Sequence, residues 1–126
     1  MNTIKPIDLL SNIDKHTAKT LFKTKPSIHA YNMLLNWIII FAIIVLHQQW
    51  SSFFLYPLAV IIIGARMHAL TVLMHDAAHF RFIKERKWND IISNFFTMYP
   101  IFTSIDKYRS NHLKHHQHLN TEDDPD

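Results

Sequence analysis

The chain has 126 residues, enough for one small domain, and it contains no cysteine. The lack of cysteine excludes a disulfide framework and any thiolate metal site, so a bound metal would be held by nitrogen and oxygen. Charge is unevenly distributed: no Asp, Glu, Lys or Arg occurs in residues 31–65, whereas residues 1–30 carry five lysines and two aspartates. Such an uncharged run excludes most soluble fold classes for a chain of this size.

Residues 1–30 form a basic segment that we expect on the cytoplasmic side of a membrane. Its Ile4, Ile7, Leu10 and Ile13 recur near the helical repeat, with lysines between and after them. This pattern fits an amphipathic helix drawn to anionic headgroups. The alternative is a solvated tail, whose lysines would only set the orientation of the chain in the membrane.

Two apolar runs, residues 33–46 and 53–65, flank a polar break at residues 47–52. Each run can be extended to the roughly 20 residues that a bilayer requires. The sequence therefore predicts an all-α integral membrane protein, with a hairpin of transmembrane helices at about residues 31–50 and 53–74. The second helix can continue to about Phe80, as a cytosolic extension beyond the membrane.

The flanks of this hairpin predict its orientation. The connection has no Lys or Arg and both outer flanks are rich in them, so the positive-inside rule makes both flanks cytoplasmic. Trp50, Phe53, Phe54 and Tyr56 at the turn resemble an interfacial aromatic belt. The alternative is a buried helical hairpin in a soluble protein. A secretory signal fits less well, because the apolar run begins after residue 30.

Seven of the ten histidines lie between residues 68 and 118, and five of them form two groups at helical spacing. His75 and His79 are four residues apart, which places both imidazoles on one helical face. The second group, His112, His115 and His116, forms a stripe if helix runs through 66–99 and 101–124. His118 falls about 120° from that stripe, and His68 lies two turns deeper than His75.

Clustered neutral imidazoles are good ligands for Zn, Cu, Fe and Ni. The conjunction of the two groups therefore predicts a metal site, with pH-sensing or simply solvated histidines as the alternatives. No His-Glu-x-x-His is present, which excludes the zinc-protease arrangement. Asp76 either orients an imidazole or is an exposed charge at the membrane exit. Without metal we expect imidazoles of ordinary basicity, protonated as pH falls toward about 6.

One metal centre requires both histidine groups on the same side of the membrane. The intervening residues 91–105 are apolar, but they number only fifteen and contain Pro100. We therefore expect an in-plane or re-entrant segment here and not a third span.

Taken together, these residues resemble the membrane fatty acid desaturase family, the histidine-box di-iron oxidoreductases. The resemblance covers residues 31–126 and makes them a partial desaturase domain. It rests on His75-Asp-Ala-Ala-His79, on Tyr108-Arg-Ser-Asn-His112-Leu-Lys-His115-His116 and on the closing segment 120–126. The spacing of the first box is more similar to acyl-lipid than to acyl-CoA desaturases.

The resemblance implies two non-haem iron ions (Fe²⁺/Fe³⁺) and dioxygen as co-substrate. The implied activity is insertion of a double bond into the acyl chain of a membrane lipid, with electrons from a ferredoxin- or cytochrome-type donor and no nucleic-acid partner. Carotenoid ketolases or hydroxylases and alkane-type hydroxylases use similar boxes and remain alternatives. The iron ligands that the resemblance assigns are His75, His79, His112, His115 and His116.

The family has a third histidine box after further membrane spans, and this chain contains only the first two. Five histidines cannot complete two reactive iron sites. We therefore expect a fragment of a longer reading frame that is inactive alone, or a site completed by another chain. A non-enzymatic membrane protein that buffers or senses metal is the alternative from a different functional class.

Overall fold

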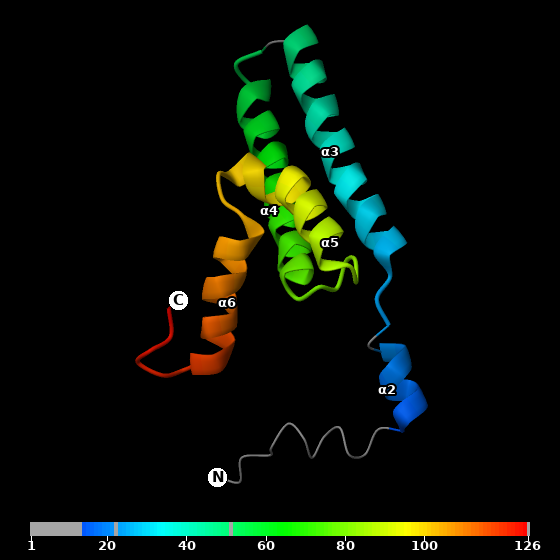
Figure 1. Cartoon of the computed structure of the whole chain (residues 1–126). Coiled ribbons are helices and arrows are strands. Elements are labelled where there is room, and N and C mark those ends of the chain that lie inside the picture. The colour runs from blue at the N-terminus through cyan, green and yellow to red at the C-terminus, as the bar shows by residue number, and fades with distance from the viewer. Residues whose placement is uncertain (1–13, 22, 51, 126) are drawn as a thin grey trace.

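The structure, a computed structural model, describes residues 14–21, 23–50 and 52–125. All regular elements within these ranges are helical, which confirms the predicted all-α class. They are shown in Figure 1 and comprise α2 (Lys15–Leu21), α3 (Pro26–Gln49), α4 (Leu55–Ala78), α5 (Arg86–Ser93), the π-helical turn η1 (Asn94–Met98), the 3₁₀ turn η2 (Tyr99–Ile101) and α6 (Ile105–His118).

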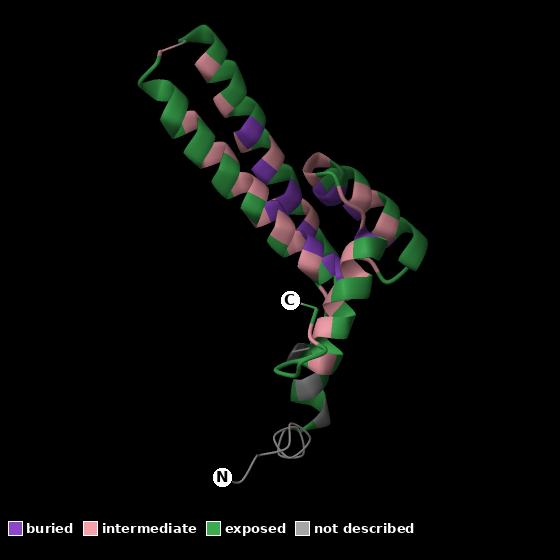
Figure 2. Cartoon of the chain, turned by 90° about the vertical axis from the view of Figure 1, so that its left-hand side faces the viewer, coloured by how far each residue is buried: buried purple, intermediate pink, exposed green. Residues whose placement is uncertain are grey.

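Helices α3 and α4 lie side by side as an antiparallel hairpin (Figure 1). Pro26 begins α3, where its missing N–H costs no helical hydrogen bond. The buried residues of α3 follow the spacing four, three, four and so form one stripe that faces α4 (Figure 2). These residues are His29, Met33, Asn36 and Ile40. The helices match the two predicted spans, with bounds shifted by up to five residues.

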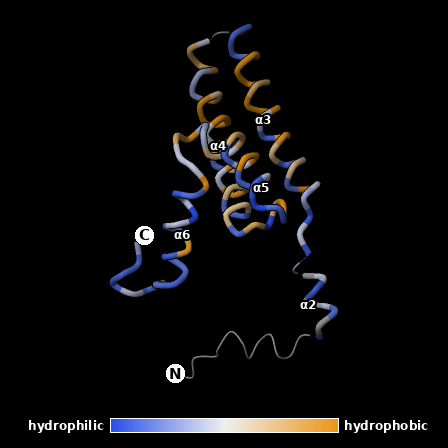
Figure 3. Tube along the Cα trace, viewed as in Figure 1, coloured by the Kyte–Doolittle hydropathy of each residue, from blue (hydrophilic) through white to orange (hydrophobic). Residues whose placement is uncertain are grey.

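Hydrophobic residues predominate along both helices of this hairpin (Figure 3), and many of their large apolar side chains are exposed. Only 22% of the most apolar window of α3 and 17% of that of α4 are buried. A helical hairpin in the core of a soluble protein would bury these faces, so their exposure favours a membrane environment. The outward large side chains include Leu34, Ile38, Phe41, Val60, Ile61 and Val72.

After α4 the chain folds back over the hairpin through α5, η1 and η2. The indole Nε1 of Trp37 donates to the Phe96 carbonyl at 3.0 Å and ties α3 to η1. Met98 and Ile105 are fully buried against the lower half of the hairpin. Within the described ranges only α3 and α4 are long and apolar enough to cross a membrane, so residues 91–105 form no third helix of that kind. Their in-plane position remains a prediction.

Two local expectations are corrected. Helix does not run through 66–99, because the chain leaves the helical conformation between α4 and α5, nor through 101–124, because α6 covers only Ile105–His118. The second helix ends at Ala78, within two residues of its expected end near Phe80. Phe102, with φ 60°, interrupts the chain before α6 begins. The amphipathic pattern of Ile4, Ile7, Leu10 and Ile13 lies outside the described residues.

Candidate metal centre

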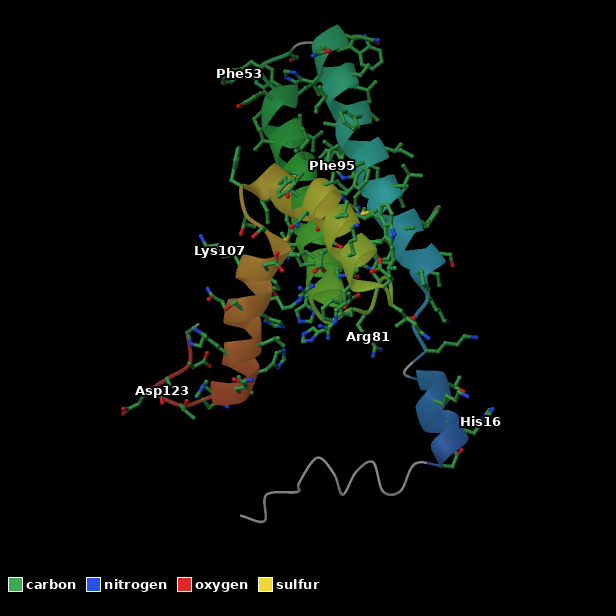
Figure 4. The ribbon with its side chains drawn as sticks, viewed as in Figure 1. His16, Phe53, Arg81, Phe95, Lys107 and Asp123 are labelled. Atoms are coloured by element: carbon green, nitrogen blue, oxygen red, sulfur yellow. The ribbon has the colours of Figure 1, made fainter. Side chains whose placement is uncertain are left out.

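Four histidines from two helices gather where the C-terminal end of α4 meets α6. His75 and His79 come from α4 and its C-cap, and His112 and His116 come from α6. One ring nitrogen of each lies within 4.8 Å of the corresponding nitrogen of every other. We call His75, His79, His112 and His116 the four-histidine cluster. The cluster lies at the end of α4, and Figure 4 shows the labelled Phe53 beside the opposite end of that helix.

The contacts around His112 are difficult to explain without a cation. Its Nε2 lies 3.0 Å from Nε2 of His79 and also 3.0 Å from Nε2 of His116. A neutral imidazole nitrogen carries either one hydrogen or one lone pair, so it makes one good hydrogen bond and not two. A shared cation satisfies all three nitrogens. Neighbouring nitrogens at about 2.1 Å from one metal ion, at right angles to each other, lie about 3.0 Å apart.

The end of α4 positions His79 through a specific backbone turn. Phe80 adopts the left-handed conformation (φ 55°), its N–H donates to the Ala77 carbonyl, and the N–H of Arg81 donates to the Asp76 carbonyl. This is the Schellman pattern, in which the residue at Phe80's position is usually glycine. Phenylalanine is strained there, but its ring lies under the guanidinium groups of Arg86, at 4.8 Å, and Arg109, at 4.2 Å.

A second set of contacts holds α6 against the end of α4. The Nε of Arg109 donates to the Ala78 carbonyl at 2.9 Å, and its two terminal nitrogens donate to the Asp90 carboxylate at 2.6 and 3.1 Å. Asn89 is fully buried, donates to the Ala77 carbonyl and accepts from the Ile83 N–H. We call Asn89, Asp90 and Arg109 the Arg109 clamp. It fixes the residue before His79 relative to the helical turn before His112.

Electrostatics at the cluster favour neutral imidazoles and a bound cation. Burial, and then the neighbouring His75 and His116, lower the pKa of His79. Burial, followed by His75, His116, His79 and His115, also lowers the pKa of His112. These two rings therefore differ from the ordinary basicity expected, and they stay available as ligands to lower pH. The C-terminal end of α4, which carries partial negative charge, also lies at the cluster.

The remaining predicted residues lie outside this cluster. His115 is directed to Asp124, with its Nδ1 2.7 Å from the carboxylate oxygen, and its ring centre is 6.2 Å from that of His112. His118, which the helical-face argument excludes, is not among the four. His68 is exposed on α4.

Asp76, weighed above as a group that orients an imidazole, contacts His75 only at 3.7 Å, with both side chains about half exposed. That distance is too long for a hydrogen bond. Two other carboxylates make short contacts near the cluster: Asp90 accepts hydrogen bonds from Arg109, and Asp124 contacts the ring of His115. Sequence reasoning missed both roles. The signal for Asp124 was the distinctive segment after the second box, and Asp90 gave none, since its partner is nineteen residues away.

The donor set fits a transition metal. All four groups are imidazoles, which suit Fe, Zn, Cu and Ni and not the oxygen-seeking Mg²⁺ or Ca²⁺. The family's iron is therefore compatible with the residues present.

Comparison with known proteins identifies the family of this chain. Residues 51–126, which include both histidine groups, match the fatty acid desaturase family. A dihydrorhizobitoxine desaturase of Bradyrhizobium elkanii is 44% identical over 77 residues, which are 60% of this chain and 22% of that protein. The chain thus spans about a fifth of the length of this curated relative. No solved structure matches it significantly. Since the family match covers more than half of the chain and contains the cluster, the chain belongs to the fatty acid desaturase family.

Proposed function

We propose that this chain forms part of a membrane-bound, O₂-dependent desaturase that introduces a double bond into the acyl chains of lipids. The observation that supports this most is the four-histidine cluster at one end of a membrane-length hairpin, in a chain of the desaturase family. Two iron ions, held by His75, His79, His112, His116 and the adjacent His115, would supply the oxidising power that side chains lack.

The proposed reaction removes two hydrogens from neighbouring carbons while dioxygen takes up two electrons and two further protons and leaves as two waters. A ferredoxin- or cytochrome-type donor would supply the electrons. The residues of this chain hold the ligands in place: the Arg109 clamp aligns α4 with α6, and the Phe80 turn positions His79. The apolar faces of α3 and α4 let a lipid approach from the bilayer, which limits the access of water.

A second candidate substrate comes from the relative. Its name states that it acts on dihydrorhizobitoxine, and the 44% identity covers the segment that carries the boxes. Desaturation of that compound by the protein to which this chain belongs is therefore a specific alternative. A ketolase, a hydroxylase and a metal-buffering protein would all use the same cluster. The reaction product, or its absence, distinguishes them from a desaturase.

The test of the function is expression of the reading frame that encodes these residues, with its flanking coding sequence, in an iron-supplied host with a ferredoxin donor. We expect new double bonds in membrane fatty acids by mass spectrometry, absent from a His112→Ala variant. Dihydrorhizobitoxine fed to the same cells tests the second substrate. Hydroxylated or keto products would contradict desaturation, and bound metal without any product would favour a buffering role.

We further propose that the N-terminal segment and both histidine boxes are cytoplasmic and that the α3–α4 connection faces the outer side. The chain has no native cysteine, so single-cysteine variants report sidedness cleanly. With a membrane-impermeant maleimide, Ser52→Cys in the connection should react in intact cells. Ser110→Cys in α6 should react only after permeabilisation. Reaction of both variants from one side would contradict the hairpin topology.

A further inference from the structure

The segment that follows α6 folds back on the helix in a defined turn, residues 119–125, which we call the C-terminal turn (Figure 1). Asn120 adopts the left-handed conformation (φ 62°), which asparagine tolerates better than most residues. The backbone N–H and the hydroxyl of Thr121 both donate to the His118 carbonyl, at 2.9 and 2.6 Å. These bonds satisfy the His118 carbonyl at the end of the helix, where the chain reverses its direction.

The reversal brings one carboxylate back to the helix. The Asp124 side chain is 14% exposed and lies 2.7 Å from Nδ1 of His115, whereas its neighbours Glu122 and Asp123 are exposed (Figure 4, where Asp123 is labelled). A run of acidic residues therefore has one member with a specific contact. The other members provide matched controls.

We propose that Asp124 is a positioning residue, which fixes the hydrogen of His115 on Nδ1 and so presents Nε2 of His115 as a ligand to a metal ion beside the four-histidine cluster. The inference rests on the proposed metal centre and deepens it. An ionised carboxylate only accepts hydrogen bonds, so the 2.7 Å contact requires a hydrogen on Nδ1. In the neutral ring, Nε2 then carries the lone pair that binds metal.

The position of His115 fits this role. Its ring centre is 5.9 Å from that of His116 and 6.2 Å from that of His112, so it borders the cluster without joining its four converging nitrogens. Nε2 of His115 would therefore hold a second ion beside the one that the cluster would hold. Among the described residues near the boxes, Asp124 is at hydrogen-bond distance from a box histidine and Asp76 is not.

The first test reads the ring directly in the metal-free chain. In detergent micelles at about pH 8, long-range ¹H–¹⁵N NMR of histidine-labelled protein distinguishes the two tautomers, and loss of a signal in His115→Ala identifies that ring. We expect the Nδ1–H form in the wild type and in Asp123→Ala, and a shift toward the Nε2–H form in Asp124→Ala. Asp124→Asn, which keeps an acceptor oxygen, should retain more of the Nδ1–H form. An unchanged tautomer in Asp124→Ala would overturn the proposal.

The second test titrates the same variants with cobalt(II), whose visible absorption reports its ligands. Loss of an outer carboxylate typically costs about 10–100-fold in metal affinity. We expect that loss for the second cobalt equivalent in Asp124→Ala, with Asp123→Ala unchanged and the Asp124→Ala/His115→Ala double variant no weaker than His115→Ala alone. A shifted tautomer with affinity equal to that of Asp123→Ala would overturn the ligand role of His115. A wild-type chain that binds no cobalt would refute the proposed metal centre itself. The tautomer measurement needs no metal, so it still tests the Asp124 contact in that case.

Discussion

Replacement of His112 with alanine is expected to weaken metal binding by the chain about 100-fold or more. His112 contributes the nitrogen that lies 3.0 Å from both His79 and His116, so its removal takes away a ligand and the link between the helices. Structural sites with four ligands bind zinc with apparent free energies of about 10–16 kcal/mol, so one ligand corresponds to roughly 3 kcal/mol. Cobalt(II) titration in micelles measures the loss.

His118→Ala is the matched control, because His118 ends the same helix and lies outside the cluster. The cobalt affinity of the His118→Ala variant should stay within about twofold of that of the wild type. Circular dichroism should show the same helix content in both variants. Equal losses in the two variants would show that the metal is held by general histidine content and not by this geometry.

Neutralisation of Asp90 is expected to weaken the packing of α6, which carries the second histidine box, against the end of α4, which carries the first. Neutralisation of Asp106 is not expected to do so. Both carboxylates contact the guanidinium of Arg109, but Asp90 is 25% exposed and paired at 2.6 Å, while Asp106 is 79% exposed and paired at 3.4 Å. Burial raises the pKa of Asp90, but the hydrogen bonds from Arg109 and Asn89 and the charge of Arg109 outweigh it. The net pKa of Asp90 is lowered, so the group is ionised at neutral pH.

Breaking a fully buried ion pair costs about 3–5 kcal/mol and breaking a surface pair about 0–1 kcal/mol. The Asp90 pair is partly exposed, so Asp90→Asn should lower the free energy of unfolding in mixed micelles by about 2 kcal/mol and the cobalt affinity about tenfold. Asp106→Asn should change both by little. A loss of stability in Asp90→Asn with unaltered cobalt affinity would mean that the clamp supports the fold without aligning the boxes.

The sequence was sufficient to predict the helical class and the hairpin, and four of the five histidines that it predicted as ligands converge in the structure. These features depend on local rules: an uncharged stretch long enough for two spans, and four-residue spacing that places side chains on one helical face. His75 with His79, and His112 with His116, satisfy that spacing regardless of what surrounds them. The same rule also excluded His118.

The sequence was not sufficient to predict how the boxes are held. The left-handed Phe80 has no local signature, because glycine is the usual residue there and its strain is offset by arginines from two other elements. The bond from Arg109 to the Ala78 carbonyl spans 31 residues and depends on tertiary packing. Likewise, helical spacing places His115 on the same stripe as His112. It gives no information on the chain reversal after α6 that brings Asp124 to the ring of His115.

In the proposed metal centre, the shared contact of His112 would link the docking of α6 to the supply of metal in the cell. Without a cation, only one of its two nitrogen contacts can be a good hydrogen bond, and this weakens the docking of α6 on α4. Metal at 100 times its dissociation constant adds about 2.7 kcal/mol of stability to the docked form. In metal-starved cells a larger fraction of the chain would therefore have α6 detached, with Ile105 uncovered and open to proteolysis. The abundance of the protein would then follow metal availability directly, through turnover and without any change in gene expression.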